Sequence, residues 1–214
     1  VVCRLYVVLG GGFHHRRIGA CGMTVALIPL AQETLQHPTR AAQQIMGWDL
    51  PRDVLWTALA LVAVLNTFLV LLVLQLSPPT FPMPSYFTRP LALYLLIAGV
   101  MVIFVHAMYW AGLAMGGRGK LDHMLALMIW FQVLRAVAQL AVVVLTLALP
   151  ALGMLLSLAV AVWGFWIFLN FIAAAMHLPS VGRALVVLIL SALGLVAGVG
   201  LITALIGLVA QGVL

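Results

Sequence analysis

Five long apolar stretches dominate the pattern of hydrophobic and polar positions, and they cover residues 55–76, 91–115, 124–149, 151–176 and 185–209. Each is long enough for a helix to cross the hydrocarbon core of a bilayer, which takes about 20 residues. The third and fourth belong to one run, residues 136–182, that contains no Asp, Glu, Lys or Arg. As a single helix this run would be about 70 Å long against a core of about 30 Å, so we expect a sharp turn at Pro150 and Gly153. The pattern therefore predicts an all-α, polytopic membrane protein, a bundle of five transmembrane helices.

A short amphipathic segment, residues 38–47, precedes the first apolar stretch. Pro38 suits the first turn of a helix, and Gly47 suits its end. One helical face is apolar and the opposite face is polar: Ala41, Ala42, Ile45 and Met46 share the first, and Arg40, Gln43 and Gln44 share the second. This arrangement is typical of an interfacial helix that lies on the membrane surface.

Residues 1–22 show no packing pattern and are interpreted as a disordered tail or as sequence upstream of the true start. Met23 is the first methionine, and a helix signal begins only after it. We therefore expect residues 1–22 to be dispensable, residues 23–54 to form a cytosolic segment, and residues 55–214 to form the membrane domain. The two cysteines, Cys3 and Cys21, have no spacing typical of a metal or redox site.

Composition and charge agree with this class and add an orientation. The chain is 66% hydrophobic and 7% charged, whereas a soluble domain has about 25% charged residues. This excludes an ordinary cytosolic enzyme, a disordered protein and a secreted disulfide scaffold. Eight of the basic residues fall on one side of the predicted bundle and Arg89 alone falls on the other, so the positive-inside rule places the N-terminus in the cytoplasm and the C-terminus outside. The net charge of +6 is then mainly a topology signal, and no basic stripe with interleaved aromatic residues indicates a nucleic-acid partner.

The glycine-rich segment between the second and third spans is a candidate site, with the sequence Gly116-Gly117-Arg118-Gly119-Lys120. It is not a phosphate-binding P-loop, because that motif needs a glycine where Ala114 stands and a Ser or Thr where Leu121 stands. We interpret it as a flexible basic turn that meets anionic lipid headgroups, or as a docking point for a partner. Since the predicted spans contain no acidic residue, no catalytic residue, metal ligand or cofactor site is expected.

Arg135 is the one charge within a predicted span, and Gln132 and Gln139 share its helical face. Three positions remain open for its side chain. It could snorkel to the headgroups if the span begins at Trp130, form a network inside the bundle with Asn66 or Asn170, or contact a partner subunit or a lipid phosphate.

Two other features predict contacts between helices. His106, Asn66 and Asn170 are single polar groups in apolar helices, and we expect them to form interhelical hydrogen bonds. Gly194 and Gly198 form a G-x-x-x-G face in the last span, and Gly112 and Gly116 repeat the spacing. Such faces favour close packing, either within the bundle or in a homo-oligomer.

Four motifs follow one another within residues 35–210: Pro38-Thr39-Arg40-Ala41-Ala42 before the first span, the glycine-rich segment, Trp163-Gly164-Phe165-Trp166 in the fourth span, and His177-Leu178-Pro179-Ser180-Val181-Gly182-Arg183-Ala184 before the fifth. Their order resembles the Ypt/Rab-interacting-protein (Yip) family, bacterial branch. The resemblance implies five spans, an inner-membrane location and an adaptor or organiser role without catalytic residues. Arg135 departs from the usually apolar third span of that family. The long acidic cytosolic region of eukaryotic members is absent, so Rab-type GTPase binding is not implied.

We therefore expect a non-enzymatic adaptor that associates with other membrane proteins or anionic lipids, with interaction residues at Pro38, Arg40, Gly116, Gly117, Arg118, Lys120, Arg135, His177 and Arg183. A small transporter or lipid-handling protein that uses the polar face around Arg135 is the alternative. A membrane enzyme is disfavoured, because the whole chain has four acidic residues.

Overall fold

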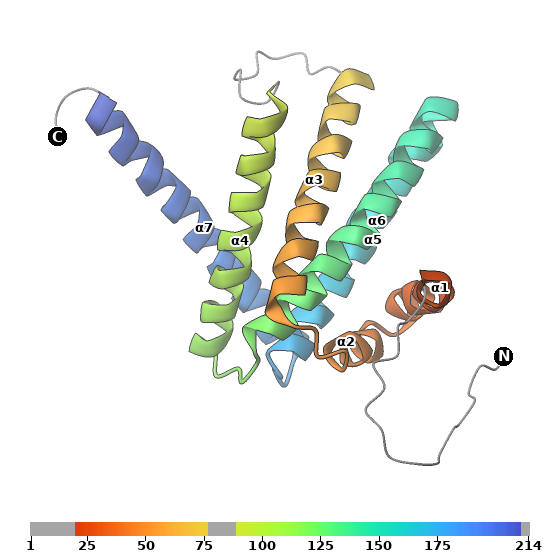
Figure 1. The fold of residues 1–214 in the computed structure, drawn as a ribbon, viewed down its shortest axis with the longest axis horizontal. Helices are drawn as coiled ribbons and strands as arrows, with labels where there is room; N and C mark the ends of the chain where they lie inside the picture. The colour runs from red at the N-terminus through yellow and green to blue at the C-terminus, as the bar shows by residue number, and fades with distance from the viewer. Residues whose placement is uncertain (1–19, 77–88, 211–214) are drawn as a thin grey trace.

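The computed structural model describes residues 20–76 and 89–210, with the side chains of residues 27–76, 89–198 and 200. Within these residues the fold has seven α-helices and no strand (Figure 1). Two helices come first and five longer ones follow: α1 (Ala20–Gln36), α2 (Pro38–Met46), α3 (Arg52–Leu76), α4 (Pro90–Ala114), α5 (Leu121–Ala148), α6 (Pro150–Ala175) and α7 (Val181–Ala210).

The five long helices agree with the five predicted spans. Each contains a segment long and apolar enough to cross a membrane, and in α7 that segment is Val181–Gly198. The predicted turn at Pro150 is confirmed. Leu149 is both the C-cap of α5 and the N-cap of α6, and Pro150 is the first residue of α6. A Cβ at Gly153 would collide with Thr146, so this glycine lets α5 and α6 pack closely beside the turn. The proline-rich connection between α3 and α4 lies outside the described residues.

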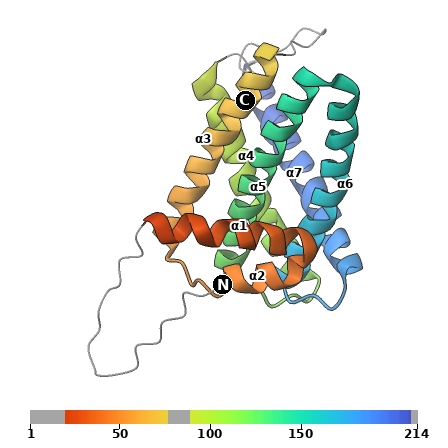
Figure 2. The same ribbon diagram turned by 90° about the vertical axis from the view of Figure 1, so that its right-hand side faces the viewer.

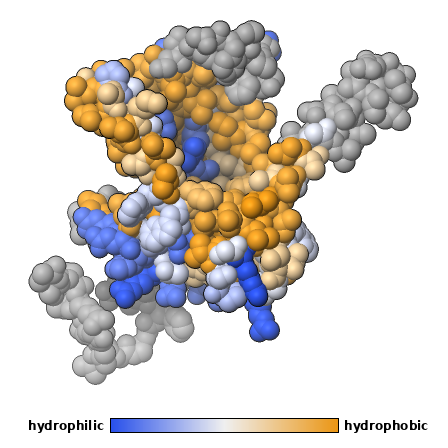
Figure 3. Space-filling model, turned by 180° about the vertical axis from the view of Figure 1, so that it is seen from behind, coloured by the Kyte–Doolittle hydropathy of each residue, from blue (hydrophilic) through white to orange (hydrophobic). Residues whose placement is uncertain are grey.

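The long helices converge at one end of the molecule and diverge toward the other (Figure 1). We call the converging end the loop end; it contains α2, the turn at residues 115–120 and the turn at residues 176–180. Its core is formed by the most deeply buried large side chains, which include Met108, Leu125, Leu127, Phe171, Ile172 and Met176. Apolar side chains also cover much of the outer surface, as expected for helices that face lipid (Figure 3).

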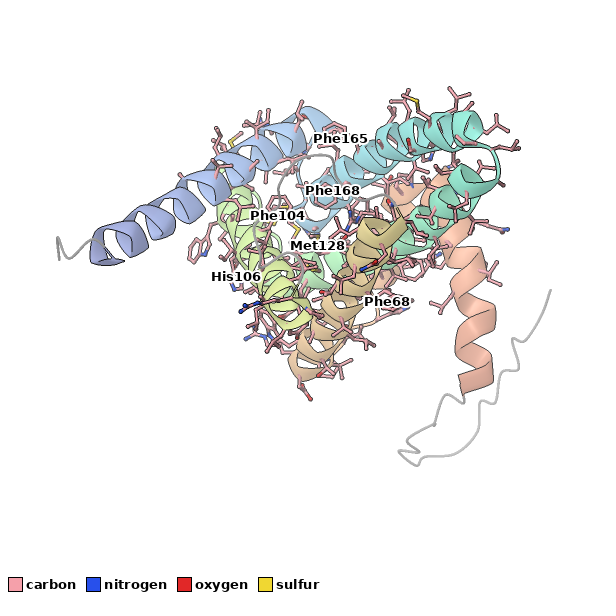
Figure 4. The ribbon with its side chains drawn as sticks, turned by 90° about the horizontal axis from the view of Figure 1, so that it is seen from above. Phe68, Phe104, His106, Met128, Phe165 and Phe168 are labelled. Atoms are coloured by element: carbon pink, nitrogen blue, oxygen red, sulfur yellow. The ribbon has the colours of Figure 1, made fainter. Side chains whose placement is uncertain are left out.

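Aromatic residues fill the middle of the bundle. Phe168 of α6 lies 4.7 Å from Phe131 of α5 and 6.3 Å from Phe104 of α4, measured between ring centroids. Seen from the diverging end, Phe104, Phe168 and Met128 gather between the helices (Figure 4). These contacts connect α4, α5 and α6 where the helices begin to diverge.

α2 and α1 lie across the long helices (Figure 2). The helix predicted at residues 38–47 is present as α2, but its apolar face is covered by protein. Pro38, Ala41, Ala42 and Ile45 are buried, and α2 contacts α5 and α6. The expectation that this face would lie on lipid is therefore not met.

α1 corresponds to the helix signal that begins after Met23, although the sequence predicted no bounds or packing for it. It includes residues 20–22, which were assigned to a disordered tail, whereas residues 1–19 lie outside the described part. Leu30 and Thr34 face the bundle, and Leu27, Ile28 and Leu35 are exposed. α1 thus has large apolar side chains on its outer face, whereas the apolar face of α2 is buried.

Candidate functional site

Arg135 lies near the middle of α5, about 21 Å along the helix axis from its first residue, Leu121. Its Nε donates to Oε1 of Gln132 at 2.9 Å, and its Nη2 donates to Oδ1 of Asn66 in α3 at 2.6 Å. Asn66 is buried and donates its own amide to the carbonyl oxygen of Val62 at 2.9 Å. The structure therefore has the arrangement in which Arg135 joins a network with Asn66 inside the bundle.

The snorkelling geometry is not found, because the guanidinium of Arg135 bonds to Asn66 of α3 instead of extending toward an end of α5. That interpretation took Trp130 as the membrane interface, but α5 begins nine residues earlier, at Leu121. Trp130 is only 8% exposed, and its Nε1 donates to Oγ1 of Thr34 in α1 at 3.1 Å. Arg135 lies about 20 Å from either end of α5. This distance is too long for its side chain to reach past a helix end.

Arg135 opens into a cleft between α3 and α5 with a volume of about 220 Å³. We call it the Arg135 cleft; its lining is Asn66, Leu69, Val70, Val73, Leu74, Arg135, Ala136 and Gln139. A guanidinium has five N–H donors, and the hydrogen bonds of Arg135 to Gln132 and Asn66 use two of them. Among the described residues no Asp or Glu pairs with Arg135, since the one ion pair there joins Arg52 and Asp122.

The glycine-rich turn at the loop end is packed, which contradicts the expectation that it would be flexible. The backbone N–H of Arg118 donates to the carbonyl oxygen of Met176 at 3.0 Å, which joins this turn to the end of α6. A Cβ on Gly117 would lie 3.0 Å from that same oxygen, and a Cβ on Gly119 would collide with the carbonyl oxygen of Ala175. The glycines therefore permit close contact between two turns that are about 60 residues apart in the sequence.

The turn between α6 and α7 is equally well defined. His177 has a φ of +52°, the left-handed conformation that commonly ends a helix, and the N–H of Leu178 donates back to the carbonyl oxygen of Ala173 at 2.9 Å. Oγ of Ser180 accepts from the N–H of Arg183 at 3.3 Å and so caps the start of α7. Both turns are thus held in place by backbone hydrogen bonds.

Most of the predicted interaction residues gather at the loop end. Arg40, Gly116, Arg118, Lys120, His177 and Arg183 are exposed, whereas Pro38 is buried and Gly117 is half-buried. Arg135 lies apart from them, in the middle of the bundle. The structure therefore divides the predicted set into a loop-end surface and the Arg135 cleft.

Comparison with known proteins finds the Yip1 domain over residues 33–202 of the 214-residue chain. The chain belongs to the Yip1 domain family. No curated protein and no solved structure is significantly similar to it. Together with the five apolar helices, the domain makes this chain a multi-pass membrane protein, and it confirms the family resemblance.

Sequence reasoning missed several contacts that hold this Yip1 domain together. Trp163 of α6 donates from Nε1 to the carbonyl oxygen of Leu35 at 3.1 Å, so α1 is bound by this residue as well as by Trp130. Met176 packs closely against Gly112 and Gly119. A Cβ added to either glycine would lie within 3 Å of an atom of Met176. No local pattern marks these residues, because each acts through a segment far away in the chain.

A smaller cavity of about 110 Å³ lies beside the loop end, and Asp49, Lys120, Asp122 and His123 line it together with apolar residues. Asp122 lies within the first turn of α5 and accepts from Nε of Arg52 at 3.1 Å. Nδ1 of His123 is buried and has no hydrogen-bond partner among the described residues. No group of three potential metal-ligating side chains occurs in the described part of the chain.

Interhelical hydrogen bonds were expected for His106, Asn66 and Asn170. Among the described contacts, Asn66 alone of these three residues forms one, with Arg135. Nδ1 of His106 lies 2.8 Å from the carbonyl oxygen of Val102, and Asn170 donates to that of Trp166 at 2.8 Å, so both bond within their own helices. His106 also stacks on Trp56 of α3, with ring centroids 6.1 Å apart.

The G-x-x-x-G face of α7 is open. No other described part of the fold comes within 4 Å of the Cβ positions of Gly194 and Gly198. The expected packing of these two glycines within the bundle is therefore not found. A role in homo-oligomers stays a prediction.

Proposed function

We propose that this Yip1 domain protein is a non-enzymatic adaptor of the bacterial inner membrane, which associates with other membrane proteins through its loop-end surface. The family assignment supports a membrane role, and the resemblance of the chain's motifs to the bacterial branch supports the location. The N-terminus faces the cytoplasm and the C-terminus lies outside, because the basic loop residues concentrate at the loop end.

One observation carries the proposal: the loop end is a preformed surface. The hydrogen bond from Arg118 to Met176 joins the two turns, and the buried face of α2 fixes that helix against α5 and α6. A surface that is already ordered loses less conformational entropy when a partner binds, and this favours recognition of a protein. Four exposed cations on it, Arg40, Arg118, Lys120 and Arg183, add attraction for anionic lipids or acidic partner segments.

Cross-linking in native membranes tests the adaptor role. A photoreactive residue in place of Lys120 should form a defined adduct with another membrane protein, and the same residue in place of Leu91, exposed near the opposite end of α4, is the matched control. We expect the adduct from position 120 and none of the same mass from position 91. Recovery of the monomer with bound lipid alone, together with measured solute or lipid flux in liposomes, would replace the adaptor by a transporter.

The Arg135 cleft favours the second candidate function, a lipid-handling or transport protein. The cleft between α3 and α5 has an otherwise apolar lining that includes the cation Arg135 and the amide side chains of Asn66 and Gln139. In this alternative the cleft would bind the head of an amphiphile during its passage. Flux that is lost in the Arg135→Leu variant would be its signature.

A further inference from the structure

We propose that the Arg135 cleft binds a transmembrane helix of another protein by pairing Arg135 with an Asp or Glu in the middle of that helix. The inference rests on the proposed adaptor function and names the chemistry of one partner. It concerns a site within the membrane, distinct from the loop-end surface.

Arg135 carries a positive charge that no described acidic residue balances. Its two acceptors among the described residues, Gln132 and Asn66, are neutral amides. Three of its five N–H donors are left over, and Arg135 lines the cleft. A cation surrounded by hydrocarbon costs several kcal/mol, and such residues usually pair with an opposite charge. Within the described residues the chain does not supply that charge.

The depth of Arg135 in the bilayer favours another helix over a lipid as the source of the anion. Because Arg135 lies about 20 Å from either end of α5, its guanidinium is near the centre of the bilayer when α5 spans it. Lipid phosphates lie at the edges of a hydrocarbon core about 30 Å thick, roughly 15 Å away. A carboxylate on another spanning helix can stand at the same depth as Arg135 without displacing the lipid, so the helix is the favoured source of the anion.

The acidic residues of this chain do not supply a partner for Arg135 in a second copy. Its four acidic residues are Glu33, Asp49, Asp53 and Asp122. Glu33 lies in α1 and accepts from Gln44 of α2, Asp49 precedes α3, and Asp53 and Asp122 lie in the first turns of α3 and α5. None of the four lies in the middle of a spanning helix, where a carboxylate of a second copy with the same orientation would stand at the depth of Arg135. The anion must therefore come from a different protein.

The lining of the cleft runs along the axes of α3 and α5, and its volume can hold side chains of a helix packed against them. On α3 the lining residues Asn66, Leu69, Val70, Val73 and Leu74 recur every three or four positions, so they form one ridge along the helix. Arg135, Ala136 and Gln139 form the facing ridge on α5, which leaves a groove with apolar walls and a polar floor. An apolar helix with a single carboxylate matches this groove in polarity and charge.

A defined peptide tests the proposal without knowledge of the natural partner. The probe is a fluorescent leucine–alanine peptide of about 20 residues, flanked by lysines, with one Glu at its centre; its control has Gln there. The purified full chain and either peptide are reconstituted in phosphatidylcholine liposomes, and association is followed by energy transfer as the peptide-to-lipid ratio rises. We expect an association constant about tenfold higher for the Glu peptide than for the Gln peptide.

Two variants assign that preference to the cleft. Arg135→Leu should abolish it, and Arg89→Leu, an exposed cation at the start of α4, should leave it unchanged. Moving the Glu to one end of the peptide should also abolish it. Equal association of the two central peptides with the unaltered chain, or a preference that survives Arg135→Leu, would overturn the proposal. A preference that disappears when phosphatidylglycerol is added would overturn it in favour of a lipid headgroup.

Failure here and failure of the adaptor role can be told apart. If the two peptides associate equally but position 120 still cross-links to a neighbour, the adaptor role stands and the intramembrane pairing is rejected. If the Glu peptide is preferred and no neighbour is found, the cleft keeps its affinity for a carboxylate and the adaptor role is rejected.

Discussion

Nη2 of Arg135 donates to Oδ1 of Asn66 over 2.6 Å and so joins the middle of α5 to the middle of α3. The two residues are 69 positions apart in the sequence, and both lie within long apolar helices. The hydrogen bond removes part of the cost of burying either group in hydrocarbon. It also fixes the floor of the cleft, because Asn66 holds the guanidinium toward α3.

Replacing Asn66 by Ala should destabilise the bundle by about 1–2 kcal/mol, because it leaves Nη2 of Arg135 without its acceptor. The measurement is the unfolding free energy of the purified protein in detergent micelles. Asn170→Ala is the matched control, since that amide bonds only to the carbonyl oxygen of Trp166 in its own helix among the described contacts. It should cost less than about 0.5 kcal/mol. Equal losses for the two variants would mean that the bond to Arg135 contributes nothing.

A methyl group at Gly119 should destabilise the protein by about 1–3 kcal/mol, because it would collide with the carbonyl oxygen of Ala175 and lie 2.9 Å from Cα of Met176. The same unfolding assay measures it. Gly194→Ala is the control: its Cβ meets no atom from elsewhere in the described fold, and helix propensity predicts a gain of about 0.5–1 kcal/mol. A neutral Gly119→Ala would show that the two turns are not in contact.

Trp130→Phe should loosen α1, because it removes the hydrogen bond from Nε1 to Oγ1 of Thr34 while keeping an aromatic ring in the buried site. Hydrogen exchange of the α1 amides should become about fivefold faster, which corresponds to a local loss of about 1 kcal/mol. Thr34→Val should have the same effect, and the double variant should be no worse than either. Trp110→Phe, at a tryptophan that is 66% exposed, should leave the α1 amides unchanged.

The span pattern could be predicted from the sequence because hydrocarbon imposes it locally. A spanning helix must be long, apolar and almost free of charge, so α3 to α7 are visible in the sequence as runs of apolar residues. The turn at Pro150 was predictable for the same reason, since a proline inside an overlong run is a natural break.

The packing of the short helices and turns could not be predicted in this way. Ala41, Ala42 and Ile45 form an apolar face whether lipid or α5 and α6 cover it, so the sequence alone gave no basis for choosing between them. Trp130 is equally ambiguous, because an indole can mark a membrane interface or bond to a buried hydroxyl. In both cases the deciding partner is distant in the sequence.

For Arg135, sequence reasoning reached the correct set of alternatives. The position of Asn66 in α3 matches that of Arg135 in α5 only if the two helices are adjacent and in register, which depends on the tertiary fold. A polar residue in each of two spans was the available signal. This signal predicted that Arg135 pairs with an asparagine, but it did not distinguish Asn66 from Asn170.

The most direct test of the whole account is the sidedness of three single cysteines. The native Cys3 and Cys21 are replaced by serine, and one cysteine at a time is placed at Lys120, Ser180 or Leu91 in the full chain. Intact cells are treated with a maleimide that cannot cross the inner membrane. The account predicts labelling at position 91 and protection at 120 and 180 until the membrane is permeabilised. Labelling of 120 or 180 in intact cells, or protection of 91, would contradict it.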